Sequence, residues 1–211
     1  MDDSLQVRDY RHLWHPYTDQ AAYEQAPYVC IEWAEGPFLY DTSGRAILDG
    51  ISSWWCVALG HGHPHVVEAI REQAGCLQQS ILGGLSHVRA VELAERLAAI
   101  APGDLNRCYF AADGSSVVEA ALKIAVQYWR LRGQPQKARF VSLEGAYHGD
   151  TLGAMCVGPI AWFREPYGAL LQPALQAPSP SCTCCDPATW SDLHCAKKAL
   201  DALERLLTEH A

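Results

Sequence analysis

Residues 110–123 read Phe-Ala-Ala-Asp-Gly-Ser-Ser-Val-Val-Glu-Ala-Ala-Leu-Lys, a pattern typical of a strand, a tight turn and a helix. The apolar run at 108–112 predicts a strand buried in a parallel sheet, and the residues after Gly114 predict a helix. Gly114 lets the backbone turn closely, and the two serines after it place hydroxyl groups beside the free N–H groups of the helix N-terminus. Such a turn favours an anionic group such as phosphate, while Asp113 and the serines are also common helix caps.

A second strand is predicted at 138–143, and it runs into Glu-Gly-Ala-Tyr-His-Gly-Asp-Thr at 144–151. Strand, helix and strand in this order predict a right-handed βαβ unit and a mainly parallel sheet. Ligands of such sheets bind outside the carboxyl ends of the strands, where Tyr147 can lay its ring against a planar heterocycle. The two segments together predict a phosphorylated aromatic cofactor. The alternative for Tyr147 is a core aromatic residue.

The Gly-Ser turn, followed by Val118, Glu119 and Lys123, and the Tyr-His-Gly at 147–149 resemble the class III aminotransferases. These are fold type I enzymes that depend on pyridoxal 5′-phosphate (PLP). Three further segments are similar to the members of this family that act in biotin biosynthesis. They are Leu-Trp-His-Pro-Tyr-Thr at 13–18, Ile-Ser-Ser-Trp-Trp at 51–55 and Gly-Gly-Leu-Ser-His at 83–87. The resemblance runs from about residue 11 to about residue 158, and it is to the N-terminal half of these enzymes only.

The resemblance implies an α/β fold with the mainly parallel sheet of the large PLP-binding domain, incomplete here, and the N-terminal part of the small domain. Residues 1–60 are expected to hold a small antiparallel β element of the small domain, and residues 61–211 the first half of the large domain. Turn residues at 41–45 predict a hairpin in the β element. Hydrophobic periodicity predicts amphipathic helices, and composition predicts a proline- and cysteine-rich excursion. The helices are expected at 64–79, 88–100, 115–131 and 193–209, and the excursion at about 161–192.

Five residues of this sequence match binding positions of the family. By resemblance, Gly114 and Ser115 bind the cofactor phosphate, and Tyr147 stacks on the pyridine ring. Tyr17 and Trp54 match positions that line the substrate pocket, where an oxo-acid chain and an adenosyl group need flat apolar walls with a polar edge. The alternative is that Trp54 and its neighbouring tryptophans form the core of the β element.

Aminotransferase chemistry needs a lysine that holds PLP as a Schiff base and a carboxylate beside the pyridine nitrogen. In this family both lie well downstream of the matched segments. None of the four lysines stands in the family's Schiff-base context, and no matching acidic segment is found. The lysines are Lys123, Lys137, Lys197 and Lys198. We therefore expect no catalytic residue in this chain and no activity from it alone.

The activity that the resemblance implies is transfer of an amino group from S-adenosylmethionine to 8-amino-7-oxononanoate, which gives 7,8-diaminononanoate. Family enzymes are homodimers with the active site at the interface, so a homodimer is expected for the full-length form. One alternative is another class III aminotransferase that uses an ω-amino or ornithine-like donor. A second alternative is a non-catalytic remnant that binds a partner subunit.

Charge and hydropathy exclude several other classes of partner. The formal net charge is −8 with only 16 lysine and arginine residues, which argues against nucleic acid and anionic membranes. No apolar run approaches the ~18 residues of a membrane helix, and the N-terminus is polar. We expect a cytoplasmic protein that acts on small molecules.

Cysteine and histidine clusters are weak candidates for metal binding. The nine cysteines cannot all pair in disulfides, and a group near the C-terminus offers zinc ligands or reduced loop thiols. Its spacing fits no common zinc module. Three histidines at alternate positions, 61, 63 and 65, resemble a set of metal ligands, but the family resemblance places them in a connection before a helix. The residues in question are Cys182, Cys184, Cys185, Cys195, His61, His63 and His65. No metal site is expected.

Overall fold

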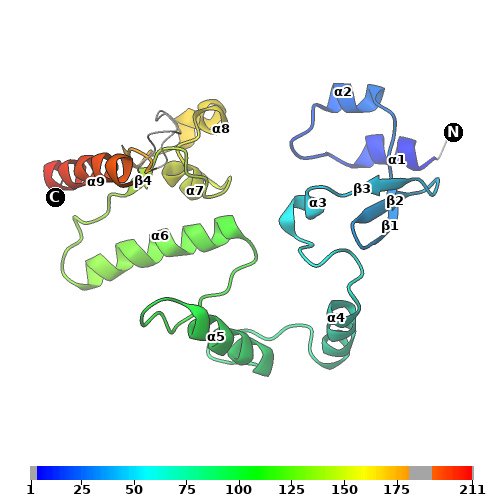
Figure 1. Cartoon of the computed structure of the whole chain (residues 1–211), viewed down its shortest axis with the longest axis horizontal. Coiled ribbons are helices and arrows are strands. Elements are labelled where there is room, and N and C mark those ends of the chain that lie inside the picture. Colours follow the sequence, from blue (N-terminus) through cyan, green and yellow to red (C-terminus); the bar gives the residue numbers. More distant parts are fainter. Residues whose placement is uncertain (1–3, 181–191, 211) are drawn as a thin grey trace. The chain divides into compact units, whose positions relative to one another are not determined.

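The computed structural model describes residues 4–180 and 192–210. The chain divides into two compact units, with the division after Val91, and each unit is described by itself (Figure 1). The α/β class expected from the sequence is confirmed, because the second unit pairs its strands in parallel between helices. The boundary expected at residue 60, between the small-domain and large-domain segments, is a different division and stays a prediction.

The first unit carries the predicted β element as a three-stranded antiparallel sheet in the order β1-β2-β3. The predicted turn at 41–45 joins β2 to β3. The Asp41 carboxylate stabilises this turn, since it accepts hydrogen bonds from the backbone N–H groups of Ser43 and Arg45 at 3.0 and 2.9 Å. The elements are α1 (Leu5–His12), α2 (Gln20–Gln25), β1 (Ile31–Glu35), β2 (Phe38–Asp41), β3 (Ala46–Leu48), α3 (Ser52–Trp55) and α4 (Pro64–Cys76).

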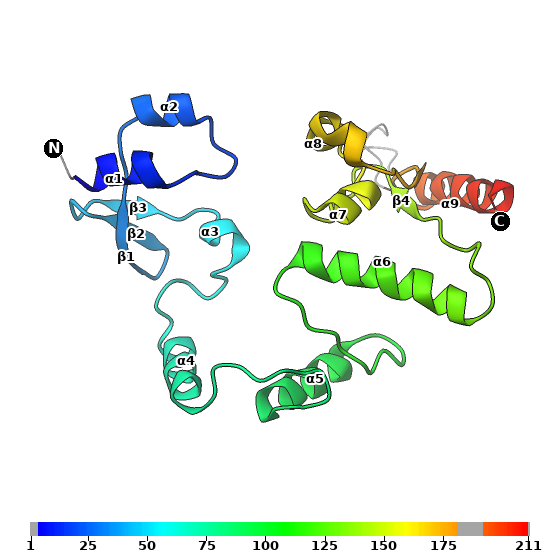
Figure 2. The same cartoon turned by 180° about the vertical axis from the view of Figure 1, so that it is seen from behind.

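The second unit contains a two-stranded parallel sheet, with Val141 of β4 opposite Leu175 of β5. α7 and α9 lie on either side of β4 in both views (Figure 1, Figure 2). The first element, α5, spans the division between the units. The elements are α5 (Val88–Ile100), α6 (Gly114–Leu131), β4 (Val141–Leu143), α7 (Leu152–Val157), α8 (Ala161–Arg164), the 3-10 helix η1 (Glu165–Leu170), β5 (Leu175–Ala177) and α9 (Asp192–Glu209).

The four predicted amphipathic helices are confirmed as α4, α5, α6 and α9. One strand prediction was wrong. The segment 108–112 is not a strand, because no described segment pairs with it and a strand needs a neighbour to bond its backbone. Within the excursion expected at about 161–192, which stays a prediction, the described residues form α8, η1 and β5. β5 has only three residues, too few to show a periodicity in the sequence.

The described core lies around the parallel strand pair. Its buried apolar residues come from α7, β5 and α9, and no large side chain among the described residues is fully buried. The apolar faces of α5 and α6 are open, as Ile100 and Leu131 show. An amphipathic stripe of this kind is normally covered by another element. In the described part of the chain, no element covers these two helix faces.

None of the described helices has the length and apolar character that crossing a bilayer requires. Within residues 4–180 and 192–210, no three potential metal-binding side chains come together. His61 bonds to the Asp49 carboxylate instead. The cluster at Cys182, Cys184 and Cys185 lies outside the described residues, as does the side chain of Cys195.

Candidate functional site

The predicted phosphate turn stands at the start of the 18-residue helix α6. The Asp113 carboxylate caps this helix, because it accepts hydrogen bonds from the Ser116 backbone N–H and hydroxyl, both at 2.8 Å. The bond from the backbone N–H is the main cause that lowers the pKa of Asp113. The Ser116 N–H is thus occupied by Asp113, and the Ser115 N–H also interacts with this carboxylate, so a bound anion competes with Asp113 for donors at the start of α6.

Ser115 binds the segment that follows β4. Its hydroxyl oxygen accepts a hydrogen bond from the Asp150 backbone N–H at 3.2 Å. Gly149 lies against this hydroxyl with a φ of +112°, a region that L-residues avoid. A Cβ at Gly149 would overlap the Ser115 hydroxyl and would lie 3.0 Å from the Ser115 Cα atom. The close approach of the two segments therefore requires a glycine.

The same contact places Tyr147 near the start of α6. The Tyr147 hydroxyl donates a 2.8 Å hydrogen bond to the Asp150 carboxylate, which raises the pKa of Tyr147. The ring is 55% exposed, and the ring of Phe163 lies beside it at a centroid distance of 5.9 Å. Tyr147 is consequently not a core residue of the described structure, and a planar ligand has access to its ring.

Glu119 makes a second link between α6 and the segment after β4. Its Oε1 atom accepts hydrogen bonds from the Thr151 hydroxyl at 2.6 Å and from the Gly153 backbone N–H at 2.8 Å. These bonds, the Thr151 bond first, lower the pKa of Glu119. In the sequence, Glu119 was noted as part of the family motif, and no role was predicted for it. The available signal was its position four residues after Ser115, which puts both side chains on one face of the helix.

Tyr17 and Trp54 come together in the first unit. Their rings meet edge to face at a centroid distance of 5.4 Å. They are 66% and 54% exposed, and Trp14 and Trp55 are exposed as well. The alternative that these tryptophans form a core is thus wrong for the described structure. The two rings form an open aromatic corner with a hydroxyl and an indole N–H at its edges.

The segment that carries Trp54 has an unusual backbone. Four consecutive residues, Ser52–Trp55, have φ values of 49°, 47°, 58° and 65°, which form a left-handed turn. Each such residue costs about 1–2 kcal/mol when it carries a side chain. Tyr17 also has a positive φ, of 53°. Strain of this kind clusters at functional sites, and no local sequence signal predicted it.

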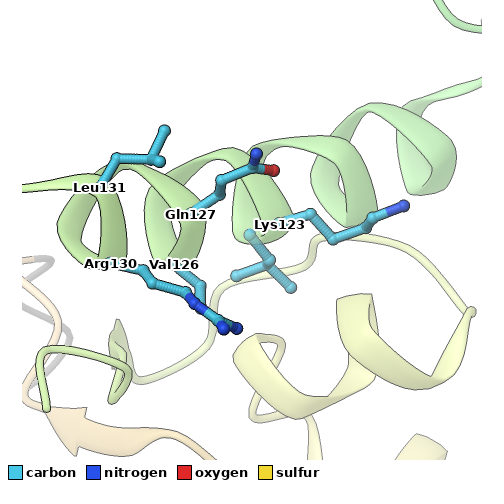
Figure 3. Close-up of a pocket in the computed structure, with 6 residues that line it drawn as sticks. Lys123, Val126, Gln127, Arg130 and Leu131 are labelled. Carbon is cyan, nitrogen blue, oxygen red and sulfur yellow. The ribbon is translucent and has the colours of Figure 1, made fainter. Parts of the chain in front are cut away.

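Lys123 lies near Glu119, whose pKa its charge helps to lower. Lys123 is exposed on α6, where it lines a groove of about 610 Å³ along one side of this single helix (Figure 3). The ammonium group of Lys137 lies 3.9 Å from the ring centroid of Trp129. The groove combines apolar side chains with basic ones, and it belongs to the open face of α6. Its lining residues are Leu122, Lys123, Val126, Gln127, Arg130 and Leu131.

Comparison with known proteins places this arrangement in a class. A crystal structure of adenosylmethionine-8-amino-7-oxononanoate aminotransferase from Methanocaldococcus jannaschii matches with a TM-score of 0.79 and 38% identity, over 83% of this chain and 40% of that chain. An omega transaminase from Pseudomonas jessenii in complex with PMP matches with a TM-score of 0.86 and 25% identity, over 98% of this chain and 46% of that one. The fold is therefore that of the fold type I PLP-dependent transaminases.

The family is defined more narrowly by sequence. The family model described as "Aminotransferase class-III" matches residues 19–211, and the chain belongs to this family. The adenosylmethionine-8-amino-7-oxononanoate aminotransferase of Geobacter sulfurreducens is 41% identical over 211 residues, which are 99% of this chain and 47% of the relative. The chain thus spans about half the length of the curated relatives it matches.

Proposed function

We propose that this protein serves biotin biosynthesis as part of a PLP-dependent aminotransferase that moves an amino group from S-adenosylmethionine to 8-amino-7-oxononanoate. The main support for this proposal is the contact between Ser115 and the Gly149-Asp150 turn. It brings a hydroxyl at a helix N-terminus together with the segment that presents an exposed tyrosine ring. A phosphorylated aromatic cofactor needs both features.

The residues at the turn fit the phosphate group of PLP. The backbone N–H groups of Gly114 and Ser115 stand at the positive end of α6, and charge-assisted bonds to such groups are strong. The Ser115 hydroxyl already accepts a bond from Asp150, which leaves its own proton for a phosphate oxygen. Asp113 opposes an anion through its charge, so the cap sets how tightly phosphate binds.

When bound, PLP acts as an electron sink for the amino-transfer chemistry. The residues of this chain bind and orient. Gly114 and Ser115 hold the phosphate, and Tyr147 covers one face of the ring while its hydroxyl stays protonated through Asp150. Tyr17 and Trp54 form a wall for the oxo-acid. The lysine that anchors the cofactor is expected from the part of the family enzymes that this chain does not match.

Homodimer assembly and a cytoplasmic location belong to the same proposal, and the family resemblance supports them. A second candidate is another ω-transaminase of class III. It is favoured by the TM-score of 0.86 to the Pseudomonas jessenii enzyme. The higher identity to the biotin-pathway relatives and the Tyr17–Trp54 pair support the first candidate.

The test is an assay of amino transfer. The chain is joined to the remaining half of the Geobacter sulfurreducens relative, and 7,8-diaminononanoate is measured by mass spectrometry with S-adenosylmethionine as donor. We expect product from the joined protein and none from the chain alone. A joined protein that binds PLP but accepts amino groups only from ω-amino acids would favour the second candidate.

A further inference from the structure

The left-handed turn Ser52–Trp55 needs something to hold it, because none of its residues favours that backbone. The Asp49 carboxylate is in position to do so. Its Oδ1 atom accepts the Ser53 backbone N–H at 2.9 Å, and its Oδ2 atom accepts the Ser53 hydroxyl at 2.8 Å. The carboxylate therefore holds the residue directly before Trp54 at two points.

A third contact fixes the carboxylate itself. The His61 Nε2 atom lies 2.7 Å from Asp49 Oδ2, and the Asp49 side chain is 4% exposed. His61 is anchored in turn, because its backbone exchanges two hydrogen bonds with Gly36, between β1 and β2. The contacts lower the pKa of Asp49 to about 2, the Ser53 backbone bond first, so the group is ionised at neutral pH. The chain of contacts thus joins the sheet to the strained turn.

We propose that Asp49 is a positioning residue whose carboxylate keeps the Ser52–Trp55 turn left-handed and so holds the Trp54 ring against Tyr17. The ring pair at 5.4 Å depends on this backbone, since Trp54 itself has a φ of 58°. The inference rests on the proposed function only for the identity of the substrate that contacts the Trp54 ring. Asp49 acts through Trp54 and has no contact with the reacting atoms.

The direct test follows the Trp54 ring in the chain labelled with 5-fluorotryptophan. Fluorine NMR gives up to seven tryptophan resonances, and Trp54→Phe identifies the relevant one. Asp49→Asn places an NH2 group where Oδ2 meets both the Ser53 hydroxyl and His61 Nε2, so the Trp54 resonance is expected to move toward the value of a mobile, exposed tryptophan. The resonances of Trp129 and Trp162 are expected to stay, which shows that the second unit is intact.

Asp41→Asn is the matched control. Asp41 also accepts bonds from a serine N–H, a serine hydroxyl and a basic side chain, but at the turn between β2 and β3. It is expected to leave the Trp54 resonance in place. Rescue is expected in the double variant Asp49→Asn with Ser52→Gly, because glycine adopts a positive φ readily and Ser52 gives no side-chain bond to the carboxylate.

An unchanged Trp54 resonance in Asp49→Asn, or an equal change in Asp41→Asn, would overturn the proposal. Where Asp49→Asn gives no folded chain, His61→Gln removes one contact, and a smaller shift of the same resonance is expected. In the joined enzyme Asp49→Asn is expected to raise KM for 8-amino-7-oxononanoate about tenfold with kcat and PLP binding retained. A shifted resonance with an unchanged KM would keep Asp49 as a positioning residue and would refute the substrate role of Trp54.

Discussion

Gly149→Ala weakens the binding of PLP to this chain about a hundredfold and lowers the free energy of unfolding by about 2 kcal/mol in our expectation. The new methyl group overlaps the Ser115 hydroxyl, and the φ of +112° is unfavourable for alanine. Either the Gly149 turn moves and takes Tyr147 with it, or Ser115 gives up its bond to Asp150. Both responses separate the phosphate donors from the ring.

Gly145→Ala is the control for this variant. Gly145 lies in the same segment with a φ of +75°, but a Cβ there meets no atom within 4 Å. It carries the backbone strain without the overlap. Urea unfolding and a titration with PLP compare the two variants. Equal losses of PLP affinity in both would show that the Ser115 contact has no part in cofactor binding.

Trp54→Ala lowers kcat/KM of the joined enzyme for 8-amino-7-oxononanoate about a hundredfold, with most of the effect on KM. The substitution removes one wall of the aromatic corner and leaves Tyr17 without its edge-to-face partner. PLP binding is expected to be retained, because the proposed cofactor residues Gly114, Ser115 and Tyr147 belong to the second unit and Trp54 belongs to the first. Steady-state kinetics with varied oxo-acid, together with the absorbance of bound PLP, separate these effects.

Trp14→Ala serves as the matched control, since Trp14 belongs to the same unit and is 91% exposed. It is expected to change kcat/KM little. A parallel loss of PLP and of substrate use in Trp54→Ala would identify Trp54 as a residue that supports folding. Unchanged kinetics would remove the support for the biotin-pathway substrate.

The sequence predicts well those elements whose signal is local. α5 has the predicted bounds because its apolar periodicity lies within the helix itself. The strand predicted at 108–112 depends on neighbouring strands, and a sequence pattern cannot supply them. The left-handed turn Ser52–Trp55 is also beyond prediction, since serine and tryptophan have no preference for positive φ and the carboxylate that stabilises it lies outside the turn.

In the candidate site, too, the features with a local sequence signal were predicted and those that depend on distant residues were not. Ser115 and Tyr147 were found as motifs, and the structure joins their segments through Asp150. The links made by Glu119 and Asp49 were missed, because their partners Gly153 and His61 are distant in sequence. Hydrogen bonds of this range become visible only once the chain is folded.

The turn at the start of α6 is proposed to hold the phosphate of PLP. The most direct measurement records backbone amide NMR spectra of the ¹⁵N-labelled chain during titration with PLP and, separately, with pyridoxal, which lacks the phosphate. We predict that the amide resonances of Gly114 and Ser115 shift when PLP is added and do not shift when pyridoxal is added. Asp113→Asn is predicted to bind PLP about three- to tenfold more tightly, because asparagine keeps the cap and removes the opposing charge. Equal shifts with both compounds, or weaker PLP binding by Asp113→Asn, would show that this turn does not hold the phosphate.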